Sequence, residues 1–267
     1  MRIARFSYGD PSDPGSAGFA FGAVRGEPGA EEVAVINGHP FGEVTFSGLR
    51  VPLAGVRLLP PVLPSKVVAI GKNYADHARE MGGEAPAEPV LFLKPSTSVI
   101  GPGGAISYPR LSKHVDFEGE LAIVIGRLCR EVPRERVPEV ILGYTCANDV
   151  TARDLQKSDG QWARAKGFDT FCPIGPWIDT DVDASDLAIM TTVNSVVKQN
   201  ARTSLLLHDV IELVAFVSAV MTLLPGDVIL TGTPAGVGPL VPGDDVSVTI
   251  EGIGTLTNTV VGTGGSR

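Results

Sequence analysis

The segment HVDFEGELAIVIG, residues 114–126, most constrains what this chain can fold into. From Leu121 onwards it has no polar side chain, which is typical of a β-strand buried on both faces. Two carboxylates, Glu118 and Glu120, stand at its start, two residues apart. Because alternate side chains of a strand point the same way, we expect these two anions to lie side by side. Neighbouring buried anions repel each other and are costly to desolvate, so the pair requires a compensating positive group.

A third carboxylate, Asp149, comes at the end of another strand-like segment, which begins at Gly143. Three carboxylates supply hard oxygen ligands, which suit Mg²⁺, Mn²⁺ or Ca²⁺ rather than zinc. A salt-bridged surface pair explains a Glu-x-Glu pattern equally well, because ion pairs at protein surfaces are common. The pattern alone therefore leaves both interpretations open.

Turn residues favour a mainly β architecture. The chain has 267 residues, of which 32 are Gly and 21 are Pro. That content suits a turn-rich β protein with few helices, an α+β fold, better than a helical bundle. Residues 1–60 contain short strand-like segments and predict a small β-rich N-terminal domain, which a Pro-rich stretch at 58–66 links to a larger domain of residues 61–267. The only long helix predicted spans 208–227, with Asp209 as its N-cap.

Several classes of protein are disfavoured. The formal net charge is −8, and no cluster of Lys and Arg with interleaved aromatic residues is present, so we expect no nucleic-acid partner. The three cysteines, at 129, 146 and 172, match neither a zinc pattern nor a disulfide framework. The longest near-apolar run, 213–224, is shorter than the ~20 residues that cross a bilayer. The first ten residues lack the apolar core of a signal peptide, so we expect a cytoplasmic protein with no membrane partner.

From Lys66 to about Val260 the chain resembles the fumarylacetoacetate hydrolase (FAH) family. The segments that carry the resemblance stand in the family's order: GKNYADHAREMG, PVLFLKPSTSVIGPGGAI, VDFEGELAIVIG, GYTCANDVTARDLQ, WARAKGFDTFCPIGPWI and TLLPGDVILTGTPAGVG. The resemblance implies a mixed β-roll as the catalytic domain. The N-terminal piece resembles the extra domain of some bacterial members known as 2-hydroxyhepta-2,4-diene-1,7-dioate isomerases, and the chain also resembles 5-carboxymethyl-2-oxo-hex-3-ene-1,7-dioate decarboxylases.

The resemblance also implies a site. When the family's site is carried over residue by residue, the implied ligands of Mg²⁺ are Glu118, Glu120 and Asp149. Mn²⁺ or Ca²⁺ can substitute for Mg²⁺. The implied catalytic groups are His77, Glu80 and Lys166, and the implied substrate-binding residues are Gln156 and Thr233. His77 and Glu80 are three residues apart, so on a helix they share a face, where the carboxylate can fix the imidazole tautomer of a general base. Lys166 would hold a developing enolate or carboxylate charge.

Further residues have weaker assignments. We interpret Arg153 and Asp154 as an ion pair that holds the loop of Asp149. Asn73 and Tyr74 are candidates for lining the cleft, and Phe168 and Phe171 either wall the pocket or belong to the core.

The expected activity is enolate chemistry on a metal-chelating 2-oxo acid. The resemblance implies a metal-bound enolate of a 2-oxo or 2-hydroxydienoate (di)carboxylate in aromatic or carboxylic-acid catabolism, followed by C–C bond hydrolysis, isomerisation or decarboxylation. Oxaloacetate decarboxylation or tautomerisation and acylpyruvate hydrolysis are alternatives. Two further hypotheses are a catalytically silent metal- or metabolite-binding domain and a vestigial catalytic domain whose residues 1–60 recruit a partner. The family also implies a homodimer with one metal site in each protomer.

Overall fold

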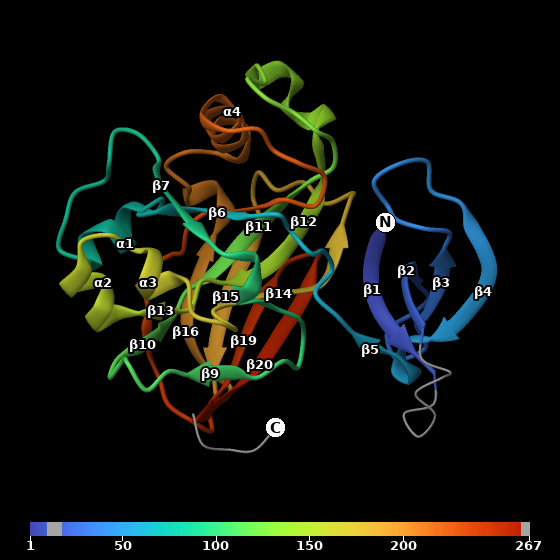
Figure 1. Ribbon diagram of the computed structural model, residues 1–267, viewed down its shortest axis with the longest axis horizontal. Coiled ribbons are helices and arrows are strands. Elements are labelled where there is room, and N and C mark those ends of the chain that lie inside the picture. The colour runs from blue at the N-terminus through green and yellow to red at the C-terminus, as the bar shows by residue number, and fades with distance from the viewer. Residues whose placement is uncertain (10–17, 263–267) are drawn as a thin grey trace.

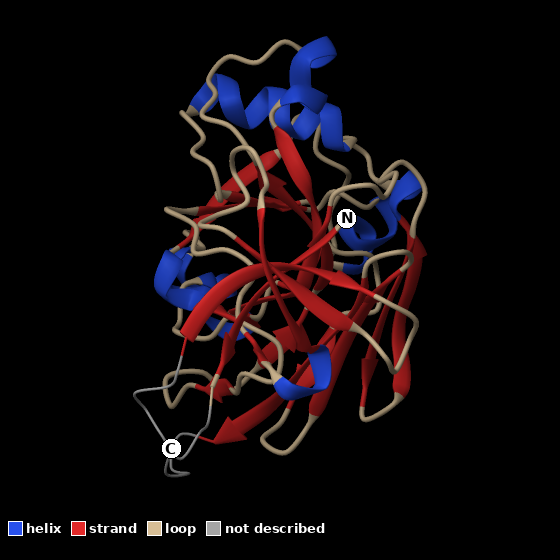
Figure 2. Cartoon of the chain, turned by 90° about the vertical axis from the view of Figure 1, so that its right-hand side faces the viewer, coloured by secondary structure: helices blue, strands red, loops and turns tan. Residues whose placement is uncertain are grey.

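Strands are the main regular structure of the molecule, which we describe from a computed structural model that covers residues 1–9 and 18–262 (Figures 1 and 2). Within these ranges the strands form three sheets of 12, three and five strands. Helices lie at the periphery of the strands (Figure 2). The mainly β prediction is therefore confirmed.

The large sheet runs in the order β4-β3-β2-β1-β14-β12-β11-β17-β6-β7, with β5 paired to β1 and β8 to β14. Its strands are β1 (Arg2–Tyr8), β2 (Gly18–Arg25), β3 (Glu32–Ile36), β4 (Phe46–Pro52), β5 (Arg57–Leu58), β6 (Val67–Gly71), β7 (Val90–Lys94), β8 (Val99–Ile100), β11 (Gly119–Ile125), β12 (Ile141–Asn148), β14 (Cys172–Asp179) and β17 (Val228–Leu230).

The smaller sheets flank the large one. The three-stranded sheet contains β10 (Val115–Phe117), β13 (Thr151–Ala152) and β18 (Gly238–Leu240), and the five-stranded sheet contains β9 (Ile106–Tyr108), β15 (Ala188–Val193), β16 (Val196–Arg202), β19 (Asp245–Ile250) and β20 (Gly254–Gly262). The helices are α1 (Ala75–Glu80), α2 (Arg153–Asp159), α3 (Ala163–Lys166) and α4 (Val210–Val220), with 3₁₀ turns η2 (Leu53–Gly55), η3 (Ser96–Ser98), η4 (Arg134–Glu139) and η5 (Thr203–Leu205).

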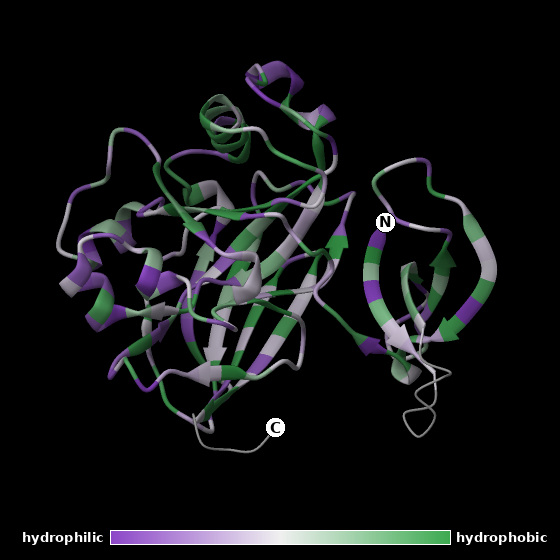
Figure 3. Cartoon of the chain, in the orientation of Figure 1, coloured by the Kyte–Doolittle hydropathy of each residue, from purple (hydrophilic) through white to green (hydrophobic). Residues whose placement is uncertain are grey.

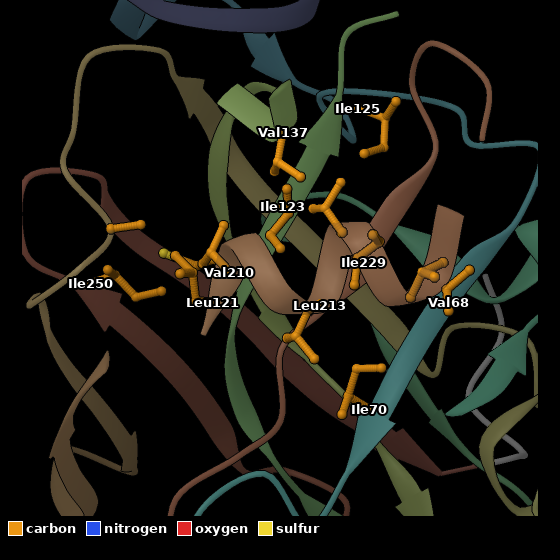
Figure 4. Packing of buried hydrophobic residues seen from close by; sticks show 14 of the residues in the cluster. Val68, Ile70, Leu121, Ile123, Ile125, Val137, Val210, Leu213, Ile229 and Ile250 are labelled. Atoms are coloured by element: carbon orange, nitrogen blue, oxygen red, sulfur yellow. The ribbon is translucent and has the colours of Figure 1, made fainter. Parts of the chain in front are cut away.

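Strand β11 is buried on both faces, as its composition predicts. Leu121, Ile123 and Ile125 belong to the core cluster beneath α4, to which Leu213 also contributes (Figure 4). The alternate residues Ala122 and Val124 face a second core cluster, on the other side of the sheet. The two clusters fix the register of β11, and with it the position of the residues at its start.

Helix α4 is shorter than the predicted span of 208–227. Its N-cap is as predicted, because Asp209 Oδ1 accepts a hydrogen bond of 2.7 Å from Glu212 N. The helix ends early because Met221 is extended and Leu223 exchanges two backbone hydrogen bonds with Cys129. Figure 3 shows that α4 is mostly hydrophobic, in keeping with the side chains it buries.

The N-terminal strands β1–β4 lie on one side of the molecule (Figure 1). They extend the large sheet, because β1 pairs antiparallel with β14 through Arg2↔Asp179 and Ile3↔Ile178. The domain boundary at residue 60 stays a prediction. All three cysteines are buried and unpaired. Among the described residues no helix is both long and apolar enough to cross a membrane.

Candidate active site

Three carboxylates meet at the start of β11. Antiparallel pairing of β11 with β12, with Gly119 opposite Asn148, brings the end of one strand to the start of the other. A backbone hydrogen bond of 2.8 Å from Asp149 N to Glu118 O holds the two ends together. One carboxylate oxygen from each of Glu118, Glu120 and Asp149 lies within 4.8 Å of the others, and all three residues are buried.

Gly119 makes this close arrangement of carboxylates fit. A Cβ atom at Gly119 would lie 2.0 Å from Oγ1 of Thr191, on the neighbouring five-stranded sheet. A side chain at this position would require Thr191 or the strand to move, so the contact favours glycine between the two glutamates. Gly232 N donates a hydrogen bond of 2.7 Å to Oε2 of Glu120, which orients the second glutamate.

Three cationic side chains surround the carboxylates. Lys166 Nζ donates to Glu118 Oε2 at 2.8 Å and to Asp149 Oδ2 at 2.7 Å. Arg153 Nη2 donates to Glu118 Oε1 at 2.6 Å. Lys94 Nζ donates to Asp149 Oδ1 at 2.5 Å. All three cations are buried, which is sustainable only because each is paired.

The carboxylates still outnumber the cations. Arg153 Nε also pairs with Asp116 at 2.8 Å, so four buried carboxylates face three buried cations. Burial alone would raise the pKa of Glu118, but Lys166 and Arg153 lower it well below its usual range. Burial, followed by the charges of Asp149 and Glu118, raises the pKa of Glu120 well above its ordinary value. Glu120 is therefore the carboxyl group of this cluster that most favours holding a proton in the absence of a further cation.

This set of residues fits a divalent cation. Its donors are carboxylate oxygens only, the set that Mg²⁺, Mn²⁺ and Ca²⁺ prefer. Glu120 accepts a backbone N–H, and among the described residues it has no ion-pair partner. A cation shared by the three oxygens would supply the positive charge that the start of β11 lacks.

His77 and Glu80 form the predicted pair. Both lie on α1, and Nδ1 of His77 is 3.1 Å from Oε2 of Glu80. The other oxygen of Glu80, Oε1, accepts a hydrogen bond of 3.0 Å from Gly236 N, in the loop that follows β17. Glu80 therefore orients the imidazole and also ties α1 to that loop.

A cavity of about 210 Å³ joins these groups. Its volume suits a small molecule rather than a polymer. The residues assigned to metal binding, catalysis and substrate binding lie in or beside this cavity: His77, Glu118, Glu120, Asp149, Gln156, Lys166 and Thr233 line it, and Glu80 contacts His77. Their functional roles stay predictions.

Aromatic side chains form one wall. Phe92 and Trp162 line the cavity and meet edge to face, with ring centroids 5.1 Å apart. Lys166 Nζ lies 5.1 Å from the Phe92 ring centroid, so its charge contacts an aromatic face as well as two carboxylates. Phe168 and Phe171 instead pack in a core cluster, so of their two interpretations the structure favours the core.

The predicted ion pair between Arg153 and Asp154 is wrong. Asp154 accepts hydrogen bonds from Ser112 Oγ at 2.6 Å and from Lys113 N at 2.9 Å. Arg153 points the other way because β13 pairs with β10, which places its guanidinium against Asp116 and Glu118.

Asn73 does not line the cavity. Its amide donates to the carbonyl oxygens of His208 and Thr231 and accepts from His208 N, so it braces the loops behind the site. Tyr74 is buried and also lies outside the cavity lining.

Lys94 and Gln199 are the residues that sequence reasoning missed. Lys94 contacts Asp149, which is 55 positions away in the chain, and Gln199 contacts Gly119, 80 positions away. A lysine inside the apolar run VLFLK was the available signal for the first, since a buried lysine requires a partner. The second, in the polar strand VVKQNAR, gave no signal.

The chain resembles known proteins over nearly its whole length. The model of the fumarylacetoacetate (FAA) hydrolase C-terminal family matches residues 66–261, and the Rv2993c-like N-terminal model matches residues 1–61. The protein in the crystal structure of 5-carboxymethyl-2-hydroxymuconate delta-isomerase from Mycobacterium smegmatis shares 56% sequence identity with this chain. The two structures superpose with a TM-score of 0.91, and the match covers 98% of this chain and 100% of that one.

Two further proteins extend the comparison. The structure of 2-hydroxyhepta-2,4-diene-1,7-dioate isomerase from Mycobacterium marinum is 57% identical, with a TM-score of 0.90 over 99% of this chain and 100% of that one. The mitochondrial oxaloacetate tautomerase Fahd2a of Rattus norvegicus is 42% identical over 223 residues, which cover 79% of this chain and 71% of the relative.

Proposed function

The chain belongs to the fumarylacetoacetate hydrolase family, and on that premise we propose that it is a divalent-metal-dependent enzyme acting on 2-oxo or 2-hydroxydienoate carboxylates through an enolate. One observation carries the proposal. Three buried carboxylate oxygens lie within 4.8 Å of one another beside a buried lysine, on the wall of a cavity sized for a small molecule. When bound, a divalent cation such as Mg²⁺ would polarise a 2-oxo group and neutralise the adjacent carboxylate.

Lys166 is positioned to stabilise negative charge. Burial alone would lower the pKa of its ammonium group, but Asp149 and Glu118 raise it, so the group stays charged. A fixed positive charge held at a buried position, as Lys166 is, stabilises an enolate oxygen more strongly than the same charge does in water. We assign Lys166 to the charge that develops on the substrate, and Gln156 and Thr233 to substrate binding.

His77 is the group assigned to proton transfer. It lines the cavity, and Glu80 engages its Nδ1, which leaves Nε2 as the nitrogen for taking up or delivering a proton. In an isomerisation or tautomerisation the imidazole would move one proton between carbon and oxygen. In a hydrolysis it would activate the water that attacks the carbonyl carbon.

Isomerisation or tautomerisation is the outcome that we favour, because two neighbours at 56–57% identity are named isomerases and a more distant relative is named a tautomerase. Hydrolysis is the second candidate, and the His77–Glu80 pair is the observation that favours it. Decarboxylation of a β-carboxylate would follow from the same enolate.

Turnover of a small panel tests the proposal. The panel contains acetylpyruvate, fumarylpyruvate, oxaloacetate and 2-hydroxyhepta-2,4-dienedioate, each with Mg²⁺ or with a chelator, followed by absorbance and product mass. Metal-dependent loss of one substrate supports the enolate mechanism, and its product identifies the outcome. Bound Mg²⁺ with no turnover of the panel would instead favour the metabolite-binding hypothesis.

Self-association is part of the same proposal. A homodimer with one complete metal site in each protomer is the arrangement that the family resemblance implies. Light scattering across a range of protein concentrations tests it, and a monomer at every concentration would refute it.

A further inference from the structure

Gln199 is a fully buried polar residue on β16, at the edge of the five-stranded sheet, yet its side chain reaches two loops of the site. Its Oε1 accepts a hydrogen bond of 3.0 Å from Gly119 N, between the two glutamates. Its Nε2 donates to Thr233 Oγ1 and to Pro234 O, each at 2.7 Å. One side chain thus connects the carboxylate cluster with the loop that follows β17.

The direction of these hydrogen bonds is fixed by chemistry. A backbone N–H can only donate, so the Gln199 atom that faces Gly119 N must be the carbonyl oxygen. A proline carbonyl can only accept, so the atom that faces Pro234 O must be the amide nitrogen. The two contacts determine the amide orientation independently of each other.

The fixed amide also sets the direction of the Thr233 hydroxyl. Oγ1 accepts from Gln199, and the hydroxyl proton is donated to Gly119 O at 2.9 Å, an atom that can only accept. A hydroxyl has one proton and two lone pairs. The proton and one lone pair of Thr233 are therefore engaged, and a single lone pair remains.

We propose that Gln199 is a positioning residue that makes Thr233 an acceptor only, so that a ligand oxygen that contacts the Thr233 hydroxyl must carry a proton. This rests on the proposed function, in which Thr233 binds a 2-oxo or 2-hydroxy acid. The site would then favour the hydroxyl-bearing form of the ligand, the enol or 2-hydroxy acid, over the ketone. A ketone oxygen would meet a lone pair at the same place.

The test compares two acids that differ at one oxygen. Lactate carries a hydroxyl where pyruvate carries a ketone, so we would measure the Kd of each, with Mg²⁺ present, by titration calorimetry. The readout is the ratio of the two values in each variant, with the tighter enantiomer of lactate used throughout. In Thr233→Val, which removes the hydroxyl at nearly constant shape, the preference for lactate should fall by about 2- to 10-fold, the value of one hydrogen bond.

The variants separate this role from a structural one. Thr233→Ser should keep the wild-type ratio, because it keeps the hydroxyl. Gln199→Met should shift the ratio towards that of Thr233→Val, because without the Gln199 amide the hydroxyl can turn away from Gly119 O and donate to the ligand. Thr191→Val is the matched control: Thr191 packs against the same Gly119, but its buried hydroxyl has no hydrogen-bond partner, so the ratio should not change.

An unchanged ratio in Thr233→Val would overturn the inference, since the hydroxyl would then make no hydrogen bond to the ligand. A fall in pyruvate affinity larger than that of lactate would also overturn it, since the hydroxyl would then be a donor. Failure of the proposed function is a separate result. If the protein turns over none of the panel but the ratio shifts as expected, this inference stands and the proposed reaction is wrong. If the protein turns over a panel substrate but the ratio does not shift, the proposed reaction stands and this inference is wrong.

Discussion

Nζ of Lys94 lies 2.5 Å from Oδ1 of Asp149, and both side chains are buried. Lys94 also donates to Val150 O at 3.2 Å, so it holds both the carboxylate and the backbone that follows. The second oxygen of Asp149 is engaged by Lys166 at 2.7 Å. The carboxylate is thus bracketed by two ammonium groups, which fix its orientation towards the glutamates.

Replacing Lys94 by Met should lower the free energy of unfolding by about 3 kcal/mol, because it removes one partner of a buried ion pair and leaves a carboxylate short of a counter-charge. Urea unfolding measures this change. Lys113→Met is the control, since Lys113 is exposed and its substitution should stay within about 0.5 kcal/mol. Equal stabilities of the two variants would mean that Lys166 alone balances Asp149.

Gly119→Ala should weaken Mg²⁺ binding and destabilise the protein by about 1–3 kcal/mol, because the new Cβ would lie 2.0 Å from Thr191 Oγ1 and the strand between the glutamates must move. Mg²⁺ titration and urea unfolding report the two effects. Adding Thr191→Ala removes the colliding oxygen and should restore part of both. If the double variant is no better than Gly119→Ala alone, crowding by Thr191 is not the reason for the glycine.

The pKa of Glu120, raised by burial and then by Asp149 and Glu118, makes the stability of the metal-free protein depend on pH. Between the ordinary pKa of a glutamate and the raised value, the unfolded chain has lost this proton while the folded chain keeps it. The contribution of Glu120 to the free energy of unfolding is therefore complete below pH ~4.3, and it is lost as the pH rises through the raised pKa.

Glu120→Gln isolates that contribution, because glutamine does not titrate. The stability of the variant relative to wild type, measured in chelator, should increase as the pH rises above ~4.3. Because Mg²⁺ displaces the proton, the affinity of wild type for the metal should rise over the same range. A stability difference that is independent of pH would show that Glu120 is ionised in the folded protein.

The start of β11 was predictable from the sequence because burial on both faces leaves a signature along the chain. Leu121 and Ala122 do face different core clusters, and this register places Glu118 and Glu120 at a strand end. The end of α4 was not predictable in the same way, since Met221 leaves the helix for a tertiary reason, the backbone pairing with a distant loop.

Long-range contacts explain the remaining errors and omissions in the site. Arg153 and Asp154 are adjacent in the sequence, but strand pairing with residues 115–116 directs the arginine to Glu118 instead. Lys94 and Gln199 have their roles only through partners on other strands. A local pattern identifies residues whose own neighbours imply their chemistry, and it cannot identify residues whose role arises from sheet topology.

His77→Asn should lower kcat by about 10²–10⁴, the usual contribution of a general acid or base, while leaving Mg²⁺ affinity unchanged, because His77 is not among the carboxylate ligands. Glu80→Gln should cost less, since it keeps the side-chain shape while weakening its hold on the imidazole. Asp76→Asn, on the same helix but exposed, is the matched control and should retain wild-type activity.

Hydrolysis, which needs an activated water, should suffer more than tautomerisation in both His77 and Glu80 variants. Equal losses in the two reactions would make the imidazole a general proton carrier, whereas full activity in His77→Asn would remove it from the mechanism.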